Sequence, residues 1–193
     1  MTAEELQQVA PDLRNELASL PSIAMSEWPM KWRFTDPKYH QLSALHLSQI
    51  SALSPAWAKR LWDIISRSRL HDAMPFVDGF FNRVESTTIG DSHGNADEDS
   101  RIRKWLYQRG VAFSTPVYLS WQPEWAVKTT WKMLVKYWTD FYYPISDDLT
   151  VIDGTFRWAL LFFHEHEVFF GTNQRGEHLA SKAFPSTCDE ADG

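Results

Sequence analysis

The chain has 193 residues, of which 44% are hydrophobic and 23% charged, the size and composition of a single globular domain. Its net charge of −6, from 19 Lys and Arg against 25 Asp and Glu, argues against a nucleic-acid binder, because such proteins carry a basic face. One cysteine, Cys188, excludes an intrachain disulfide and a zinc site built from cysteines.

The start of the chain favours a cytoplasmic location. Residues Met1 to Leu6 are acidic where a signal peptide needs basic residues followed by an apolar run. No run reaches the ~18 apolar residues that a membrane span requires. We therefore expect a cytoplasmic protein with no membrane segment.

The first third predicts short helices and one strand. Residues 2–19 have helical spacing, and Thr2 followed by Glu5 forms a capping-box pattern. The alternation of polar and aromatic residues in 31–34 predicts a strand, and Trp28, Trp32 and Phe34 are expected to fill the core. Residues 43–69 are again helical in pattern, with a break at Ser54-Pro55 where Ser54 can cap the second helix.

An acidic stretch, 91–99, follows an apolar patch and predicts a surface loop. Its spaced carboxylates suggest calcium, but its glycine stands at the fourth loop position and Ile102 replaces the twelfth-position Glu, so a calcium loop is disfavoured. Ser100 is expected to cap a helix that runs to Arg109 and is closed by Gly110.

The last third holds the densest apolar material. Residues 111–121 predict a strand, and the apolar spacing of 124–141 predicts one long amphipathic helix ending before Pro144. Strands are then expected at 149–152, 156–163 and 168–171, with a hairpin turn at Asp153-Gly154. The prediction is a single α+β domain, 1–175, with helices packed on a mainly antiparallel sheet, and a partly disordered tail, 176–193.

Two polar breaks in this apolar frame are candidates for chemistry. On an extended strand, His164 and His166 would share a face and could bind a transition metal with Asp147 or Asp148. The simpler interpretation is a solvated connection between two strands. Asp147 and Asp148 could likewise act as acid and base, although Ser-Asp-Asp in a turn usually hydrogen-bonds to nearby backbone.

No nucleophile, phosphate-loop or dinucleotide signature is present, so we expect neither a cofactor nor, on balance, an enzyme. Cys188 lies in the predicted tail, a poor place to hold a nucleophile against a base.

The spacing Thr129-Thr130-Trp131, Trp138-x-x-Phe141 and Asp147-Asp148 resembles an uncharacterised family of small bacterial proteins. The Trp32-Arg-Phe34 and Ala58-to-Trp62 segments extend this resemblance to about residues 28–170. The Trp-x-x-Phe-Tyr-Tyr-Pro-x-Ser-Asp-Asp run is similar to segments of stand-alone bacterial immunity-type proteins, which block a toxin by binding it. The first resemblance carries over no catalytic residues, and the second implies a protein partner.

These observations favour a protein-binding module, an immunity-type inhibitor that engages a basic toxin through acidic and aromatic residues. The expected partner-binding residues are Tyr142, Tyr143, Asp147, Asp148, Glu165 and Glu167. One alternative is a metal-dependent, hydrolase-like enzyme centred on His164 and His166. Another is a structural homodimer, which the sequence does not separate from the first hypothesis.

Overall fold

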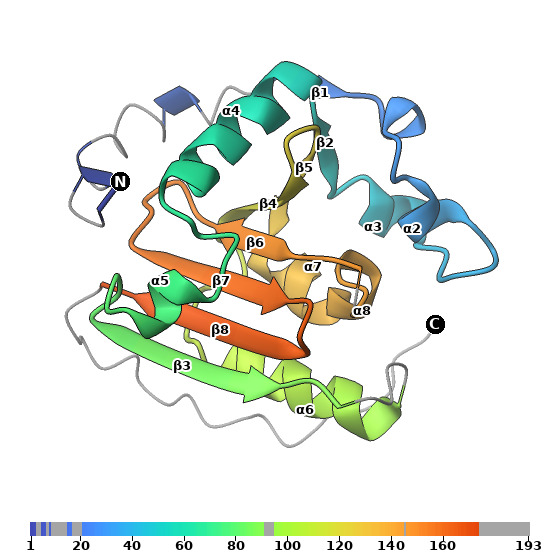
Figure 1. The fold of residues 1–193 in the computed structure, drawn as a ribbon. Coiled ribbons are helices and arrows are strands. Elements are labelled where there is room, and N and C mark those ends of the chain that lie inside the picture. Colours follow the sequence, from blue (N-terminus) through green and yellow to red (C-terminus); the bar gives the residue numbers. More distant parts are fainter. Residues whose placement is uncertain are drawn as a thin grey trace.

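The computed structural model describes residues 1, 2, 5, 6, 8, 15, 16, 21–90, 95–144 and 146–173 (Figure 1). The strands are β1 (Ser22–Ile23), β2 (Ser51–Leu53), β3 (Arg83–Thr88), β4 (Pro116–Gln122), β5 (Trp125–Thr130), β6 (Leu149–Ile152), β7 (Trp158–Phe163) and β8 (Glu167–Thr172). The helices are η1 (Met25–Glu27), α2 (Trp32–Thr35), α3 (Ala44–Leu47), α4 (Pro55–Arg67), α5 (Met74–Val77), α6 (Ala96–Tyr107), α7 (Trp131–Lys136) and α8 (Trp138–Phe141).

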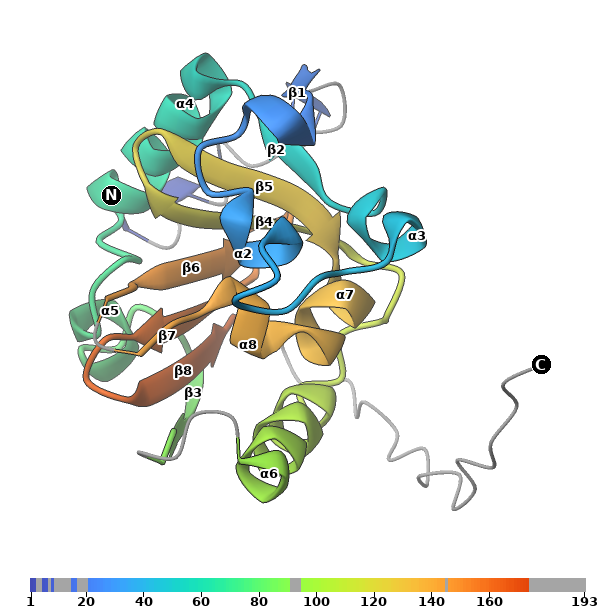
Figure 2. The same cartoon turned by 90° about the vertical axis from the view of Figure 1, so that its right-hand side faces the viewer.

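The eight strands of the described residues form one sheet in the order β1-β2-β5-β4-β6-β7-β8-β3, and all neighbouring pairs are antiparallel. Helices cover both faces of this sheet. In Figures 1 and 2, α4 and α5 lie on one face, and α6, α7 and α8 lie on the other. The predicted α+β class, with helices packed on an antiparallel sheet, is confirmed.

Strand β7 shows why the sequence of this region is so apolar. Its even-numbered residues, such as Leu160 and Phe162, pack in the cluster beneath α6, α7 and α8. Its odd-numbered residues, such as Leu161, pack in the cluster beneath α4 and α5. Because both faces of the sheet are covered, the strand reads as a continuous apolar run instead of an alternating one.

The three predicted C-terminal strands are confirmed as β6, β7 and β8. The turn between β6 and β7 is held by Asp153, whose Oδ1 accepts hydrogen bonds from the backbone of Thr155 (2.9 Å) and Phe156 (3.1 Å). This is the local carboxylate-to-backbone bonding for which Asp is favoured in turns. The predicted strand 111–121 is also present, as β4.

The predicted long helix, 124–141, is wrong. Residues 123 and 124 form the turn of a hairpin, and β5 pairs with β4 on one side and with β2 on the other. The helix begins only at Trp131, where the side chain of Thr130 accepts a hydrogen bond from Met133 N (3.3 Å) and caps α7. The chain then changes direction at Tyr137, so α7 and α8 are separate.

The apolar spacing predicted a helix wrongly because Val127 and Trp131, which are four residues apart as on one helix face, lie on opposite sides of the boundary between β5 and α7. Val127 is an inward residue of β5, paired with Leu119, whereas Trp131 starts the helix. The two β-branched residues before it, Thr129 and Thr130, favour a strand and were the stronger local signal.

The strand predicted at 31–34 is also wrong, because α2 occupies this position. Arg33 and Phe34 are adjacent in sequence and both are buried. Adjacent side chains of a strand point to opposite faces, whereas two adjacent side chains of a helix can both face the core. Of the three expected core aromatics, Trp28 and Phe34 are fully buried, whereas Trp32 is only half-buried.

The pattern over 43–69 resolves into α3 and α4 with the short strand β2 between them. Pro55 opens α4 as predicted, but the side chain of Ser54 makes no capping hydrogen bond. Ser43 instead caps α3, since its Oγ accepts a hydrogen bond from His46 N (3.3 Å).

The capping box predicted at the N-terminus is confirmed. Thr2 N donates to Glu5 Oε2 at 2.8 Å, and Glu5 N donates to Thr2 Oγ1 at 3.2 Å. Each side chain therefore satisfies the other's backbone N–H. The predicted tail, 176–193, lies outside the described residues, and no described helix is long and apolar enough to cross a membrane.

Helix α6 begins five residues earlier than predicted, at Ala96, because Asn95 and not Ser100 caps it; Asn95 Oδ1 accepts from Asp97 N at 2.9 Å. Residues 91–94 of the acidic stretch lie outside the described residues. Asp97, Glu98 and Asp99 lie in the first turn of α6, where negative side chains interact favourably with the positive end of the helix dipole. Gly110 follows the helix at φ 69°, as its predicted closing role requires.

Replacing Glu98 with Gln should destabilise the protein at neutral pH by about 1–2 kcal/mol. The Glu98 carboxylate accepts hydrogen bonds from Gly90 N (2.6 Å) and from Arg101, whose guanidinium also binds the carbonyl of Thr88. The bond from Arg101 contributes most to lowering the Glu98 pKa from 4.5 to about 2.

A lowered folded-state pKa means that this stabilisation is present above pH 4.5 and is lost as pH falls towards 2. The difference in unfolding free energy between wild type and Glu98→Gln, measured by urea denaturation, should shrink over that range. Asp97→Asn, at an exposed position in the same helical turn, is the control and should change stability little at any pH.

Candidate binding surface

Three carboxylates on the segment from Trp138 to Asp148 each bind a basic side chain from a different part of the fold. Asp140 binds His40, Asp147 binds Arg33, and Asp148 binds His164. The bases come from the loop after α2, from α2 itself and from the turn between β7 and β8. This carboxylate segment therefore joins the N-terminal third of the chain to its last hairpin.

Asp147 is buried and does not lie on the surface, contrary to its predicted role in partner binding. Its two oxygens accept hydrogen bonds from the two terminal nitrogens of Arg33, at 2.6 and 2.8 Å. Oδ2 also accepts from Tyr143 N at 2.9 Å, and the Arg33 and Asp147 side chains are only 4% and 8% exposed. The sequence predicted local turn bonding at Asp147, and the bond to Tyr143 N fits that prediction.

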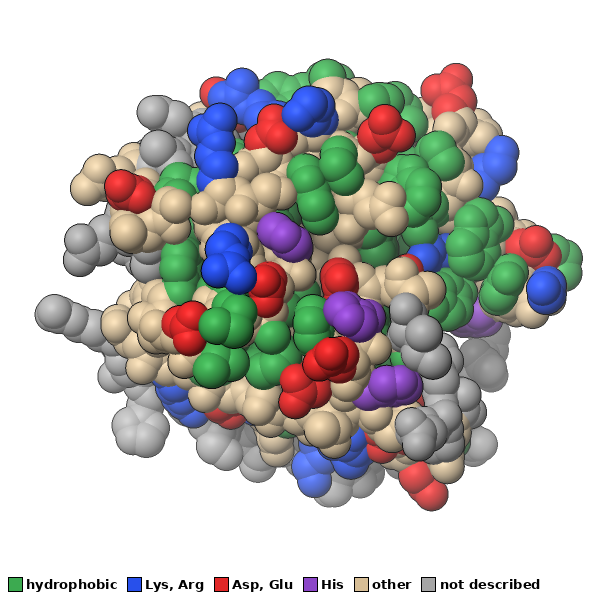
Figure 3. Space-filling view, viewed as in Figure 1, with side chains coloured by type: hydrophobic (Ala, Val, Ile, Leu, Met, Phe, Trp, Pro, Cys, Tyr) green, Lys and Arg blue, Asp and Glu red, His purple; other side chains and the backbone are tan. Residues whose placement is uncertain are grey.

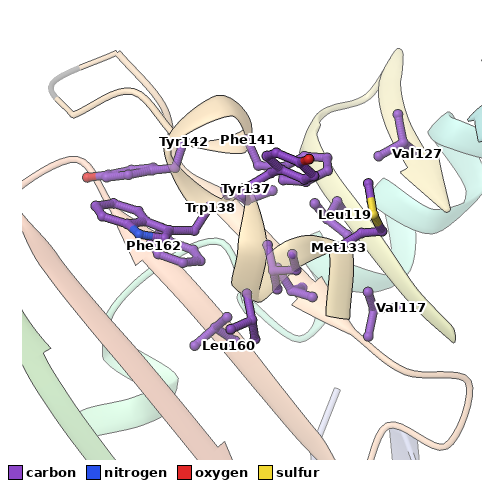
Figure 4. Packing of buried hydrophobic residues seen from close by; sticks show 14 of the residues in the cluster. Val117, Leu119, Val127, Met133, Tyr137, Trp138, Phe141, Tyr142, Leu160 and Phe162 are labelled. Atoms are coloured by element: carbon purple, nitrogen blue, oxygen red, sulfur yellow. The ribbon is translucent and has the colours of Figure 1, made fainter. Parts of the chain in front are cut away.

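Tyr142 is also buried, so its predicted role in partner binding is wrong. Figure 4 shows its ring beside Phe162 and close to Trp138, and the Tyr142 and Phe162 centroids are 5.1 Å apart. Its hydroxyl donates a hydrogen bond to the carbonyl of Phe163 at 2.7 Å. Burial raises the pKa of Tyr142 well above the ordinary tyrosine value. The chain turns inward after α8, and the sequence carried no signal for this.

Tyr143 is half-buried and belongs to an aromatic cluster with Trp32 and Tyr39. The ring centroid of Tyr143 lies 5.7 Å from that of Trp32 and 6.0 Å from that of Tyr39. The Arg33 guanidinium lies 4.5 Å from the Tyr143 centroid, a cation–π contact on the inner side of the cluster. Burial is the main cause that raises the pKa of Tyr143 to about 12.

The turn between β7 and β8 brings together three of the predicted residues. Asp148 Oδ1 accepts hydrogen bonds from both the backbone N (3.0 Å) and the ring Nδ1 (2.8 Å) of His164. Glu165 is exposed and Glu167 is half-buried. We define Asp148, His164, Glu165 and Glu167 as the acidic turn surface. Figure 3 shows acidic and histidine side chains gathered where β7 ends and β8 begins.

The two glutamates of this surface are not ion-paired within the described residues, unlike carboxylates such as Glu85, which binds Arg109, and Glu98, which binds Arg101. Glu165 and Glu167 form no ion pair with any described residue. Two unneutralised carboxylates are thus two residues apart in sequence, Glu165 in the turn and Glu167 as the first residue of β8.

The arrangement proposed for a metal at His164 and His166 does not occur. These residues form a turn and not an extended strand, and His166 has a φ of 62°, so the two side chains do not share a strand face. His164 Nδ1 is already bound to Asp148. In the part of the chain that is described, no group of three or more His, Cys, Asp or Glu side chains is placed to hold a metal.

The pair formed by His40 and Asp140 was not among the predicted site residues. The Asp140 carboxylate is 6% exposed, its Oδ2 lies 3.0 Å from His40 Nδ1, and burial raises the pKa of Asp140. Nearby, Tyr137 Oη lies 2.7 Å from His46 Nδ1. An Asp within the apolar run of α8 was the available signal, because a buried carboxylate needs a partner.

Comparisons with family models, with curated proteins and with solved structures found no match for the chain. The resemblances to a small bacterial family and to immunity-type proteins therefore stay predictions.

Proposed function

We propose that the chain is a protein-binding module of the cytoplasm, an immunity-type inhibitor whose acidic turn surface engages a basic toxin. The observation that carries this proposal is the pair of unneutralised carboxylates, Glu165 in the turn between β7 and β8 and Glu167 at the start of β8, close in sequence to His164, which binds Asp148. A basic partner can form ion pairs there without breaking any that the described residues make among themselves. Complementary charge speeds encounter and selects among partners.

The rigidity of the surface also supports binding. His164 is held to Asp148 through two hydrogen bonds, and Asp148 follows directly after the buried Asp147. A turn fixed in this way loses little conformational freedom when a partner binds, and this preorganisation favours affinity.

Neutralising the surface should weaken binding to the partner. In the test, each strongly basic protein encoded beside this gene is purified and its association with the chain is measured by surface plasmon resonance. For the true partner, Glu165→Gln/Glu167→Gln should lower the association rate constant about tenfold at low salt, with a smaller effect at high salt.

The matched control is Glu124→Gln, because Glu124 is an exposed carboxylate in a different turn, between β4 and β5. It should bind as wild type does. Co-expression then tests inhibition: the wild type should protect cells from the partner, and the double variant should protect less. Equal losses in the control and the double variant, or no basic neighbour that binds, would contradict the proposal.

A further inference from the structure

We infer that His164 makes the acidic turn surface pH-dependent, so that a basic partner is held above neutral pH and released at mildly acidic pH. The inference rests on the proposed function, because it concerns the same surface. It is carried by the contact between His164 and Asp148, one of the three carboxylates of that surface.

The geometry fixes which ring nitrogen takes up the proton. Nδ1 of His164 lies 2.8 Å from Asp148 Oδ1 and donates to it when Asp148 is ionised. In the neutral ring Nε2 is then the unprotonated nitrogen. The side chain is 45% exposed, so water can deliver a proton to this ring. Histidine is the side chain that changes its charge between pH 5 and 8.

Protonation would change the charge that the partner meets. With a neutral His164, the surface carries the charges of Asp148, Glu165 and Glu167. The imidazolium form places a positive charge in direct contact with Asp148, which is then neutralised as an ion pair. It also repels a cationic side chain that approaches the two glutamates.

Two other titratable groups near His164, Asp147 and Tyr142, do not change the charge of the acidic turn surface. Asp147 is paired with Arg33, and the hydroxyl of Tyr142 stays neutral because burial raises its pKa. His166 lies in the same turn, and its Nδ1 is buried without a hydrogen-bond partner in the described residues. A separate variant at His166 therefore tests whether this residue contributes to the pH dependence.

The test uses a fluorescent peptide of ten lysines as the basic probe, at low salt and at pH 7.5 and 5.5. Wild-type affinity should fall roughly fivefold at pH 5.5, the effect expected for one exposed charge pair. In His164→Asn, whose amide can still donate to Asp148 but does not titrate, the affinity should change less than twofold. Proton NMR of the His164 ring should show its protonation midpoint at the pH where affinity is half lost.

Two histidine variants serve as controls. His40→Asn changes the other histidine–carboxylate pair and should keep the full pH dependence. His166→Asn, chosen because Asn tolerates the left-handed backbone at φ 62°, should keep most of it.

The outcomes separate the two proposals. If Glu165→Gln/Glu167→Gln weakens probe binding but His164→Asn keeps the full pH dependence, the switch is overturned and the binding surface stands. If the double variant binds the probe as wild type does, the surface itself fails, and the switch fails with it.

Discussion

Replacing Asp147 with alanine is expected to lower the free energy of unfolding by about 3–5 kcal/mol, the cost of breaking a buried ion pair from one side. The change leaves the Arg33 guanidinium buried, at 4% exposure, without its counter-charge. Arg33 would keep the bond from Nη1 to the carbonyl of Phe141 (3.3 Å) and its aromatic contacts, but none of these supplies a negative charge, and its Nε is already buried without a partner in the described residues. Tyr143 N loses its acceptor as well. Urea denaturation at pH 7 measures the loss.

Two further variants test the physical cause. Asp148→Ala changes the adjacent carboxylate, which is 34% exposed, and should cost less than about 1 kcal/mol. Arg33→Met/Asp147→Leu removes both charges and should recover most of the stability, because apolar residues can replace a buried ion pair at little cost. A double variant no more stable than Asp147→Ala would show that the unpaired charge is not the cause.

Replacing Gly171 with alanine is expected to cost about 2–3 kcal/mol, at the upper end of the usual penalty for overpacking a core. A Cβ at this position in β8 would lie 2.1 Å from an atom of the Phe81 ring and 2.4 and 2.6 Å from two others. Phe81 has little room to yield, because its ring also packs on Phe76 and Phe80. Thermal unfolding followed by circular dichroism gives the size of the loss.

Gly90→Ala is the matched control, since the added Cβ would lie 3.4 Å from the Glu98 carboxylate, an ordinary contact. It should change stability by less than about 1 kcal/mol. Combining Gly171→Ala with Phe81→Leu should cost less than the sum of the two single changes, because the smaller side chain makes room. Strict additivity would mean that the clash with Phe81 does not limit this site.

Local patterns in the sequence predicted the C-terminal sheet well. The hairpin at Asp153 combines a turn residue with strands of continuous apolar character, so every local signal agrees. The prediction failed at Val127 and Trp131, where helical spacing arose from a strand followed by a helix. Periodicity averages over a window, and it cannot show that the backbone changes conformation inside that window.

The candidate surface was predicted in part for a related reason. Asp148 and Glu165 lie in connecting segments, which run mostly over the surface, so their placement followed from local composition; Glu167 is the first residue of β8. Whether Tyr142 and Asp147 face outward depended on Arg33 and Phe162, which are distant in sequence. One sequence carries no information on such pairings, and both residues proved to be buried.

The ion pairs of the carboxylate segment also bear on how the protein folds. Arg33 and Asp147 are 114 residues apart, and His40 and Asp140 are 100 residues apart, so closing these contacts requires the chain to be in place as far as Asp147. Contacts between such distant residues form slowly, because the entropy of a long loop is lost before they are made. The contact between Asp148 and His164 spans only 16 residues, but it lies in the last hairpin, so a nascent chain that still lacks this hairpin has no acidic turn surface to offer a partner.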